Sequence, residues 1–249
     1  MLVIAHLSDT HFGGHPSAVE RATRVVDHLL RLDPPVDAVL VTGDVADHGR
    51  PEEYAEARDV LGRLRQPVLW CPGNHDVRLE YAAMRGLPGD VPVNEAHRVD
   101  GHLFLMLDSL VDAVDGVRQD HGHLTQTTLD WLDEQLSGRA PGERAFVCFH
   151  HPPVDIHIGL MDPIRLDNPD QLEAVLGRHA DVVAVLVGHA HTAGTTSYAG
   201  LPLLIGGGVA STVTLDAEPY PPLTHELGPS FAVHFIGDDG RVVTHWRTL

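Results

Sequence analysis

Short apolar runs of four to six residues recur along this 249-residue chain, and helical segments lie between several of them. Runs of this length that are rich in β-branched residues are typical of strands buried on both faces. The alternation of such strands with helices favours an α/β architecture. The sequence predicts strands at Leu2–Leu7, Ala38–Val41, Val68–Cys71, Leu103–Leu107, Ala145–Phe149, Val182–Val187 and Leu201–Ile205, and helices at Val19–Leu32, Glu52–Leu64, Thr127–Leu136 and Gln171–His179.

The last part of the chain departs from this alternation. Two strand-like stretches, Phe231–Phe235 and Val242–Trp246, follow one another without a helix between them, so we expect antiparallel pairing there and a mixed sheet. The proline-rich segment Ala217–Pro229 is predicted to be a surface loop or lid. A chain of 27.0 kDa with 43% hydrophobic residues can bury one sizeable core, so we expect a single domain over residues 1–249.

Charge and cysteine content limit the classes of partner. The formal net charge of −18 argues against a nucleic-acid polymer or an anionic membrane surface as the partner. The two cysteines, Cys71 and Cys148, each lie inside an apolar run, which is no pattern for a disulfide framework. The chain opens with the strand-like run Leu2–Ala5 and no basic leader. We therefore expect a cytoplasmic protein.

Metal-ligand residue types gather where five of the predicted strands end. In open α/β sheets, ligands bind in the crevice outside the carboxyl ends of the strands, so clusters that are distant in sequence are expected to converge there. Carboxylate and imidazole without thiolate favour Mn, Fe or Zn over an iron–sulfur cluster or a zinc ribbon. The clusters are Ser8-Asp9-Thr10-His11, Gly43-Asp44, Gly73-Asn74-His75-Asp76, His150-His151-Pro152-Pro153 and Gly188-His189-Ala190-His191.

The individual residues suit different parts of a metal site. Asp9 and His11 are two residues apart at a strand end, and both can reach one metal once the strand loses its regular alternation. The two carboxylate oxygens of Asp44 can bridge two metals, and the neutral amide oxygen of Asn74 leaves its metal a strong Lewis acid. Glycines before three of these segments permit tight turns and close backbone approach; they are Gly43, Gly73 and Gly188.

In this order, the motifs D-x-H, G-D, G-N-H-D, H-x-P and G-H-x-H resemble the signature of the calcineurin-like metallophosphoesterases over residues 9–191. The resemblance implies a four-layer α/β/β/α fold in which two packed mixed β-sheets are flanked by helices, with residues 192–249 forming a C-terminal β region and the proline-rich loop. It also implies two divalent metal ions per chain, Mn²⁺, Fe²⁺/Fe³⁺ or Zn²⁺. One metal would be held by Asp9, His11, Asp44 and His191, and the other by Asp44, Asn74, His150 and His189.

The histidine pair before Pro152 leaves an alternative open. The family pattern places the ligand two residues before a proline, which favours His150 over His151. The mechanism that the resemblance implies is attack on phosphorus by a hydroxide bridging the two metals, with Asp44 and His75 as catalytic residues. Asn74, His75 and His191 would contact the substrate, and His75 would hydrogen-bond the phosphate or protonate the departing alkoxide. Asp76 would orient His75 or cap the following helix. Among the other histidines, His48 and His157 are the candidates for the border of the pocket.

Within the family, the chain is similar to the bacterial branch of class III cyclic-nucleotide phosphodiesterases and glycerophosphodiesterases. The opening Leu7–His11, the segment Gly43–Gly49 and the doubled His-His-Pro-Pro carry this similarity. It implies a small phosphodiester substrate, 3',5'-cyclic AMP or similar, and a homo-oligomer, with a dimer expected. The alternatives are a glycerophosphodiesterase or a broad phosphomonoesterase and diesterase. A nuclease would need a basic track for a nucleic-acid backbone, and a non-catalytic scaffold would be expected to lack one or more ligands.

Overall fold

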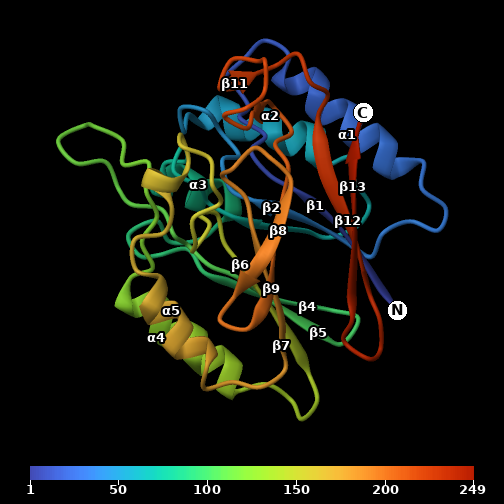
Figure 1. Cartoon of the computed structure of the whole chain (residues 1–249), viewed down its shortest axis with the longest axis vertical. Coiled ribbons are helices and arrows are strands. Elements are labelled where there is room, and N and C mark those ends of the chain that lie inside the picture. The colour runs from blue at the N-terminus through green and yellow to red at the C-terminus, as the bar shows by residue number, and fades with distance from the viewer.

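The computed structural model, which describes residues 1–249, contains thirteen strands, five α-helices and one short 3-10 helix (Figure 1). The strands are β1 (Leu2–Leu7), β2 (Ala38–Thr42), β3 (Val68–Cys71), β4 (Glu95–Val99), β5 (His102–Met106), β6 (Arg144–Cys148), β7 (Val182–Val187), β8 (Gly194–Tyr198), β9 (Leu201–Ile205), β10 (Thr212–Val213), β11 (Leu223–Thr224), β12 (Ser230–Ile236) and β13 (Val242–Thr248). The helices are α1 (Ala18–Leu30), α2 (Pro51–Leu61), α3 (Arg78–Arg85), α4 (Gln126–Ser137), η1 (Asp162–Ile164) and α5 (Pro169–Leu176).

Two large sheets form the centre of the molecule. One has the strand order β13-β12-β1-β2-β3, and the other has the order β4-β5-β6-β7-β9-β8. β1, β2 and β3 run parallel, whereas β12 and β13 pair antiparallel. In the second sheet β5, β6, β7 and β9 run parallel between antiparallel edge strands β4 and β8. Both sheets are therefore mixed, as predicted.

The strand side chains alternate between two kinds of core. Ala5 and Leu7 of β1 pack with residues of α1, α2 and α3, whereas Ile4 packs in a core between the sheets. From the second sheet, Phe146 lies in that inter-sheet core, while Val147 packs with residues of α4 and α5. Helices thus lie on the outer side of each sheet (Figure 1). The predicted four-layer fold is confirmed, and burial on both faces explains why the strand runs are continuously apolar.

The predicted boundaries agree with the structure to within a few residues. β1, β3, β7 and β9 have the predicted bounds, and β5 and β6 are each shifted by one residue toward the N-terminus. α2 and α5 end three residues earlier than predicted, because the chain leaves the helix at Gly62 and Gly177. No helix of the structure is both long enough and apolar enough to cross a lipid bilayer.

Three longer elements are missing from the sequence prediction. β4 and β8 are edge strands without an apolar run. In β8, for example, Thr195 and Ser197 are exposed. α3 is only eight residues long and has no side-chain cap. The prediction for Ala217–Pro229 is also incomplete, because Leu223–Thr224 forms β11 and pairs with β10; the remainder is mostly exposed, as expected of a surface segment.

Candidate metal centre

The five predicted clusters meet at one edge of the two sheets. β1, β2 and β3 deliver their carboxyl ends from one sheet, and β6 and β7 deliver theirs from the other. Parallel strands place the segments that follow them along a common edge. The structure thereby brings together all seven side chains that the sequence predicts as ligands: Asp9, His11, Asp44, Asn74, His150, His189 and His191.

Four of these side chains form a first group. The ligand atoms of Asp9, His11, Asp44 and His191 all lie within 4.8 Å of one another. His11 Nε2 is 3.4 Å from Asp44 Oδ2, and His191 Nε2 is 3.4 Å from Asp9 Oδ1. This is the set predicted for one metal.

The second group shares Asp44. His150 Nε2 lies 3.4 Å from Asp44 Oδ2, 3.1 Å from Asn74 Oδ1 and 3.1 Å from His189 Nδ1. A single carboxylate oxygen of Asp44 is therefore 3.4 Å from a ring nitrogen of each group. Asp44 is placed to bridge two cations, as its carboxyl group suggests in the sequence.

The backbone of the centre is held in an unusual conformation. Asp9, His11, Asp44, His189 and His191 all have positive φ, between 42° and 68°. For residues other than glycine this region costs of order 1–3 kcal/mol each, so the surrounding fold must impose it. The conformation ends the regular alternation of β1, so Asp9 and His11 can serve the same group, as expected.

Two glycines make room for the centre. Gly43 has a φ of 88°, and a Cβ at this position would collide with the His150 ring. A Cβ on Gly73 would collide with the Asp44 carboxylate and backbone. Both positions therefore require glycine for the close approach that the sequence suggests.

The donor atoms fit a bound cation. His11 Nδ1 lies 2.8 Å from the Asp47 carboxylate, and His150 Nδ1 lies 2.7 Å from the Thr42 carbonyl oxygen. Both partners only accept, so in the neutral rings Nδ1 carries the proton and Nε2 has a lone pair. These lone pairs point toward the oxygens of Asp44 and Asn74, which also have lone pairs to offer. Such a convergence of acceptors is stable only around positive charge.

Burial strengthens this demand for positive charge. Asp9 is fully buried, and neither of its carboxylate oxygens has a hydrogen-bond partner. Burial by itself would lower the pKa of His150, but the Asp44 carboxylate outweighs it and raises the pKa to about 9. Burial lowers the pKa of His191 to about 4 despite the nearby Asp9 carboxylate. A divalent cation would satisfy the carboxylates and displace the His150 proton.

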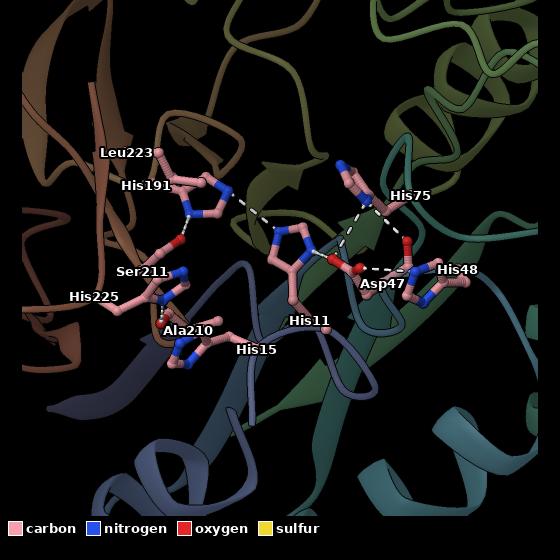
Figure 2. A pocket seen from close by; sticks show the side chains of 11 residues that line it. His11, His15, Asp47, His48, His75, His191, Ala210, Ser211, Leu223 and His225 are labelled. Atoms are coloured by element: carbon pink, nitrogen blue, oxygen red, sulfur yellow. Dashed lines mark hydrogen bonds and ion pairs between the residues drawn. The ribbon is translucent and has the colours of Figure 1, made fainter. Parts of the chain in front are cut away.

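Further side chains hydrogen-bond the candidate ligands and fix their orientation. The sequence analysis did not identify these further side chains. Figure 2 shows Asp47 and Ser211 on opposite sides of the His11–His191 pair. Ser211 Oγ is 2.8 Å from His191 Nδ1. The Asn74 amide nitrogen donates to Asp120 Oδ1 at 3.4 Å, which turns the amide oxygen toward His150. Asp47 lies inside the quoted Gly43–Gly49 motif, whereas Ser211 and Asp120 follow no motif.

His75 lies at the opening of the centre. Its backbone N–H donates to Asp44 Oδ1 at 2.8 Å, and its Nδ1 is 2.9 Å from the Asp47 carbonyl oxygen. Burial lowers the pKa of its ring, although the Asp44 carboxylate opposes this effect. The protonated ring of His75 is consequently a minor form at neutral pH. It is also a stronger acid than an ordinary imidazolium.

The predicted roles of Asp76 are wrong. Its carboxylate accepts from the backbone N–H groups of Gly73, Val45 and Ala46, and from the Tyr54 hydroxyl. Asp76 therefore ties the turn after β3 to the turn after β2. It neither contacts the His75 ring nor caps α3, whose N-cap position is Val77.

The geometry distinguishes His150 from His151. His150 Nε2 faces Asp44 and Asn74, whereas His151 Nδ1 is 2.9 Å from Ser109 Oγ. His151 also belongs to a buried group of three with His150 and His189, and its Nε2 has no partner. The contacts with Asp44 and Asn74 support the choice of His150.

Three cavities surround His75. The largest, about 400 Å³, is walled mainly by histidines, and the other two measure about 340 and 160 Å³. His48 lines the first two, in agreement with its predicted position at the border. His157 lines a different cavity, beside β8 and β9, so the alternative prediction for it is wrong. Leu223 of β11 lines the cavities of about 400 and 160 Å³.

Comparison with known proteins identifies the family. A model of the family described as calcineurin-like phosphoesterase matches residues 2–193. This chain belongs to that family. Calcineurin-like phosphoesterases use a dinuclear metal centre, and the two residue groups that share Asp44 fit one. The predicted membership and the predicted class of enzyme, a phosphoric ester hydrolase, are confirmed.

Relatives of this calcineurin-like phosphoesterase include bacterial phosphodiesterases. A glycerophosphodiester phosphodiesterase of Enterobacter lignolyticus is 37% identical over 212 residues, which cover 79% of this chain and 73% of that protein. A 3',5'-cyclic-nucleotide phosphodiesterase of Nostoc is 33% identical over 196 residues, covering 76% and 71%. The solved structure of a dimetal phosphatase of Danio rerio has a TM-score of 0.72 at 19% identity, covering 99% of this chain and 96% of that one. The last similarity is one of fold.

Proposed function

We propose that this protein is a binuclear metal-dependent phosphodiesterase that hydrolyses a small phosphodiester, 3',5'-cyclic AMP or a similar compound. The observation that carries the proposal is the position of Asp44 Oδ2, 3.4 Å from both His11 Nε2 and His150 Nε2. This carboxylate oxygen lies between the ligand nitrogens of the two groups, which is the arrangement that a pair of cations requires. The whole chain, residues 1–249, would act as one catalytic domain.

The seven candidate ligands would hold the two cations in the groups described above. Their carboxylate, amide and imidazole donors suit Mn²⁺, Fe²⁺/Fe³⁺ or Zn²⁺. When bound, the pair of cations would supply Lewis acidity and generate hydroxide from water at neutral pH as the nucleophile. Asp44 would hold the two metal positions together, which gives it its catalytic role.

Three side chains would act on the substrate. Asn74, His75 and His191 line the cavity of about 160 Å³ that contains Asp44. The Nδ1 proton of His75 is held by the Asp47 carbonyl oxygen, so its Nε2 is free for the substrate. In its imidazolium form, Nε2 also carries a proton, with which His75 would hydrogen-bond the phosphoryl group or protonate the departing alkoxide.

The relatives support a diester of low molecular weight as the substrate. Those quoted above act on cyclic nucleotides or on glycerophosphodiesters, so a glycerophosphodiester, or a broader range of monoesters and diesters, is the second candidate. The net charge of −18 disfavours a nucleic-acid polymer. A cytoplasmic location and a homodimer stay predictions; light scattering at micromolar concentration tests the dimer.

The proposal is tested on protein purified without chelator. Bound metals are counted by mass spectrometry, and turnover is measured on bis(p-nitrophenyl) phosphate, p-nitrophenyl phosphate and cyclic AMP. We expect two metals per chain and diesterase activity, both reduced by Asn74→Ala. Protein that binds no metal and stays inactive after addition of Mn²⁺ would contradict the proposal and favour a non-catalytic scaffold.

The role of His75 is tested by His75→Ala in the same assays. Loss of a general acid lowers kcat by about 10²–10⁴-fold for a poor leaving group such as that of cyclic AMP. The effect should be smaller for p-nitrophenolate, which departs without protonation, and the metal content should not change. Equal turnover of cyclic AMP by the variant and the original protein would remove the acid role.

A further inference from the structure

Arg118 lies beside the candidate metal centre and has no part in the function proposed so far. It belongs to the segment between β5 and α4 and lines two of the cavities around His75, those of about 340 and 160 Å³. The smaller cavity is also lined by Asp44, His189 and His191. The guanidinium therefore borders the same space as the candidate ligands.

Arg118 is the cation most available to a ligand in this space. The other arginine of these cavities, Arg78, is buried and engaged by the Asp108 carboxylate and by the carbonyl oxygen of Leu110 at 2.7 Å. The side chain of Arg118 is 47% exposed. In a protein with a net charge of −18, an exposed cation at the opening of the site is a specific feature rather than part of a basic surface.

Of the two contacts that the Arg118 guanidinium makes, only one is to an acceptor. Nε donates to Asp120 Oδ1 at 2.6 Å, and Nη1 lies 2.9 Å from His75 Nδ1. That ring nitrogen is also 2.9 Å from the carbonyl oxygen of Asp47, which can only accept. His75 Nδ1 therefore carries a proton, and a donor faces a donor. The Asp47 carbonyl is part of the backbone, so the exposed arginine is the partner that moves to another acceptor.

We propose that Arg118 binds a non-bridging oxygen of the substrate's phosphoryl group and so selects anionic phosphoesters over neutral esters. This rests on the proposed function, because it places the phosphoryl group between the cations and His75. Guanidinium matches phosphate oxygens in geometry, and such charge-assisted hydrogen bonds are about twice as strong as neutral ones. Arg118 is thus a specificity-determining residue, supplied by a loop rather than by a strand end.

An indirect route has to be separated from this one. Asp120 Oδ1 accepts from Arg118 Nε and also from the Asn74 amide nitrogen at 3.4 Å. Removal of Arg118 could therefore disturb Asn74, a candidate metal ligand. That effect would appear as a loss of metal, whereas loss of a phosphate contact would not.

The test compares Arg118→Ala, Arg118→Lys and the control Arg241→Ala. Arg241 is also exposed and pairs with Asp239, two residues away, at 3.8 Å. Its replacement by alanine removes the same charge at a position far from the centre. Each protein is loaded with Mn²⁺ and its metal content measured. Binding of inorganic phosphate is then followed by calorimetry, and kcat and KM are determined for bis(p-nitrophenyl) phosphate.

We expect Arg118→Ala to weaken phosphate binding about 10-fold and to raise KM by a similar factor, with unchanged metal content and little change in kcat. Arg118→Lys should fall between it and the control, because lysine keeps the charge but not the forked donors. Phosphate affinity equal to that of Arg241→Ala, or a loss confined to metal content, would overturn the proposal. If the original protein hydrolyses no diester, the proposed function fails, while phosphate binding still tests Arg118.

Discussion

At the scale of single residues, the candidate centre depends on side chains that contact its ligands as much as on the ligands. Asp47 shows this most clearly. Its carboxylate lies 2.8 Å from His11 Nδ1 and thereby fixes which ring nitrogen of His11 faces Asp44. The hydrogen bond to His11 also lowers the pKa of Asp47, so the carboxylate stays ionised. Such outer partners fix the tautomer and orientation of a metal-binding histidine.

Replacement of Asp47 should therefore weaken metal binding without removing a ligand. For Asp47→Ala we expect affinity for Mn²⁺ to fall by about 10- to 100-fold, measured by competition with a chelator. Asp47→Asn keeps an oxygen that can accept from His11 Nδ1, so it should lose less. Identical affinities in Asp47→Ala and the original protein would show that His11 is oriented by other contacts.

At the scale of elements, the start of α2 orders the loop that presents Asp47. The buried carboxylate of Glu53, in the first turn of α2, accepts from the backbone N–H groups of His48 and Arg50 at 2.9 and 3.2 Å. It also lies 2.8 Å from His48 Nδ1. A carboxylate in the first turn is favoured by the helix dipole as well. The helix thus holds the end of the Gly43–Gly49 motif in place.

Glu53→Ala should destabilise the fold, because it leaves the backbone N–H groups of His48 and Arg50 without their acceptor in a partly buried site. We expect the free energy of unfolding, measured in urea, to fall by about 1–3 kcal/mol. Glu53→Gln retains one accepting oxygen and should recover part of the loss. A variant as stable as the original protein would mean that the loop is held mainly by its other contacts, such as those of Asp76.

At the scale of the whole molecule, the five-stranded sheet contains a buried polar chain that crosses four strands. His6 of β1 lies 2.8 Å from Thr42 Oγ1 of β2 and 3.2 Å from His234 of β12, which in turn lies 2.9 Å from Thr244 Oγ1 of β13. Burial lowers the pKa of both histidines, that of His6 well below its ordinary value and that of His234 to about 3. The fold therefore requires both rings to be neutral.

This pair should make the stability of the protein sensitive to acid. A histidine whose pKa is lower in the folded state binds its proton mainly in the unfolded state, so stability is lost as the pH falls from about 6.5 toward 3. His234→Gln removes one such group. We expect the chelator-treated variant to lose about 2 kcal/mol less than the original protein between pH 7 and pH 5, measured by urea unfolding at both pH values. Equal losses would show that His234 is not kept neutral by the fold.

The family, the main strands and the type of site could be predicted from the sequence alone. The order of the motifs identified the family, and the apolar runs before them predicted the strands. Since parallel strands align their carboxyl ends, Asp9, Asp44 and His189 could be expected to meet although they are far apart in the chain. Their residue types indicated a divalent metal centre because carboxylate and imidazole limit the chemistry available.

Only the tertiary structure decided which residues outside the motifs contact the candidate centre, because these contacts join segments that are distant in the sequence. Arg118, Asp120 and Ser211 reach the centre from loops, where position follows from the packing of distant elements rather than from local periodicity. The family pattern already favours His150 over His151, and the structure adds the physical reason: both rings are buried, but the His150 ring faces Asp44. The edge strands β4 and β8 lack an apolar run because most of their side chains are exposed or only partly buried, so the core does not require apolar residues there.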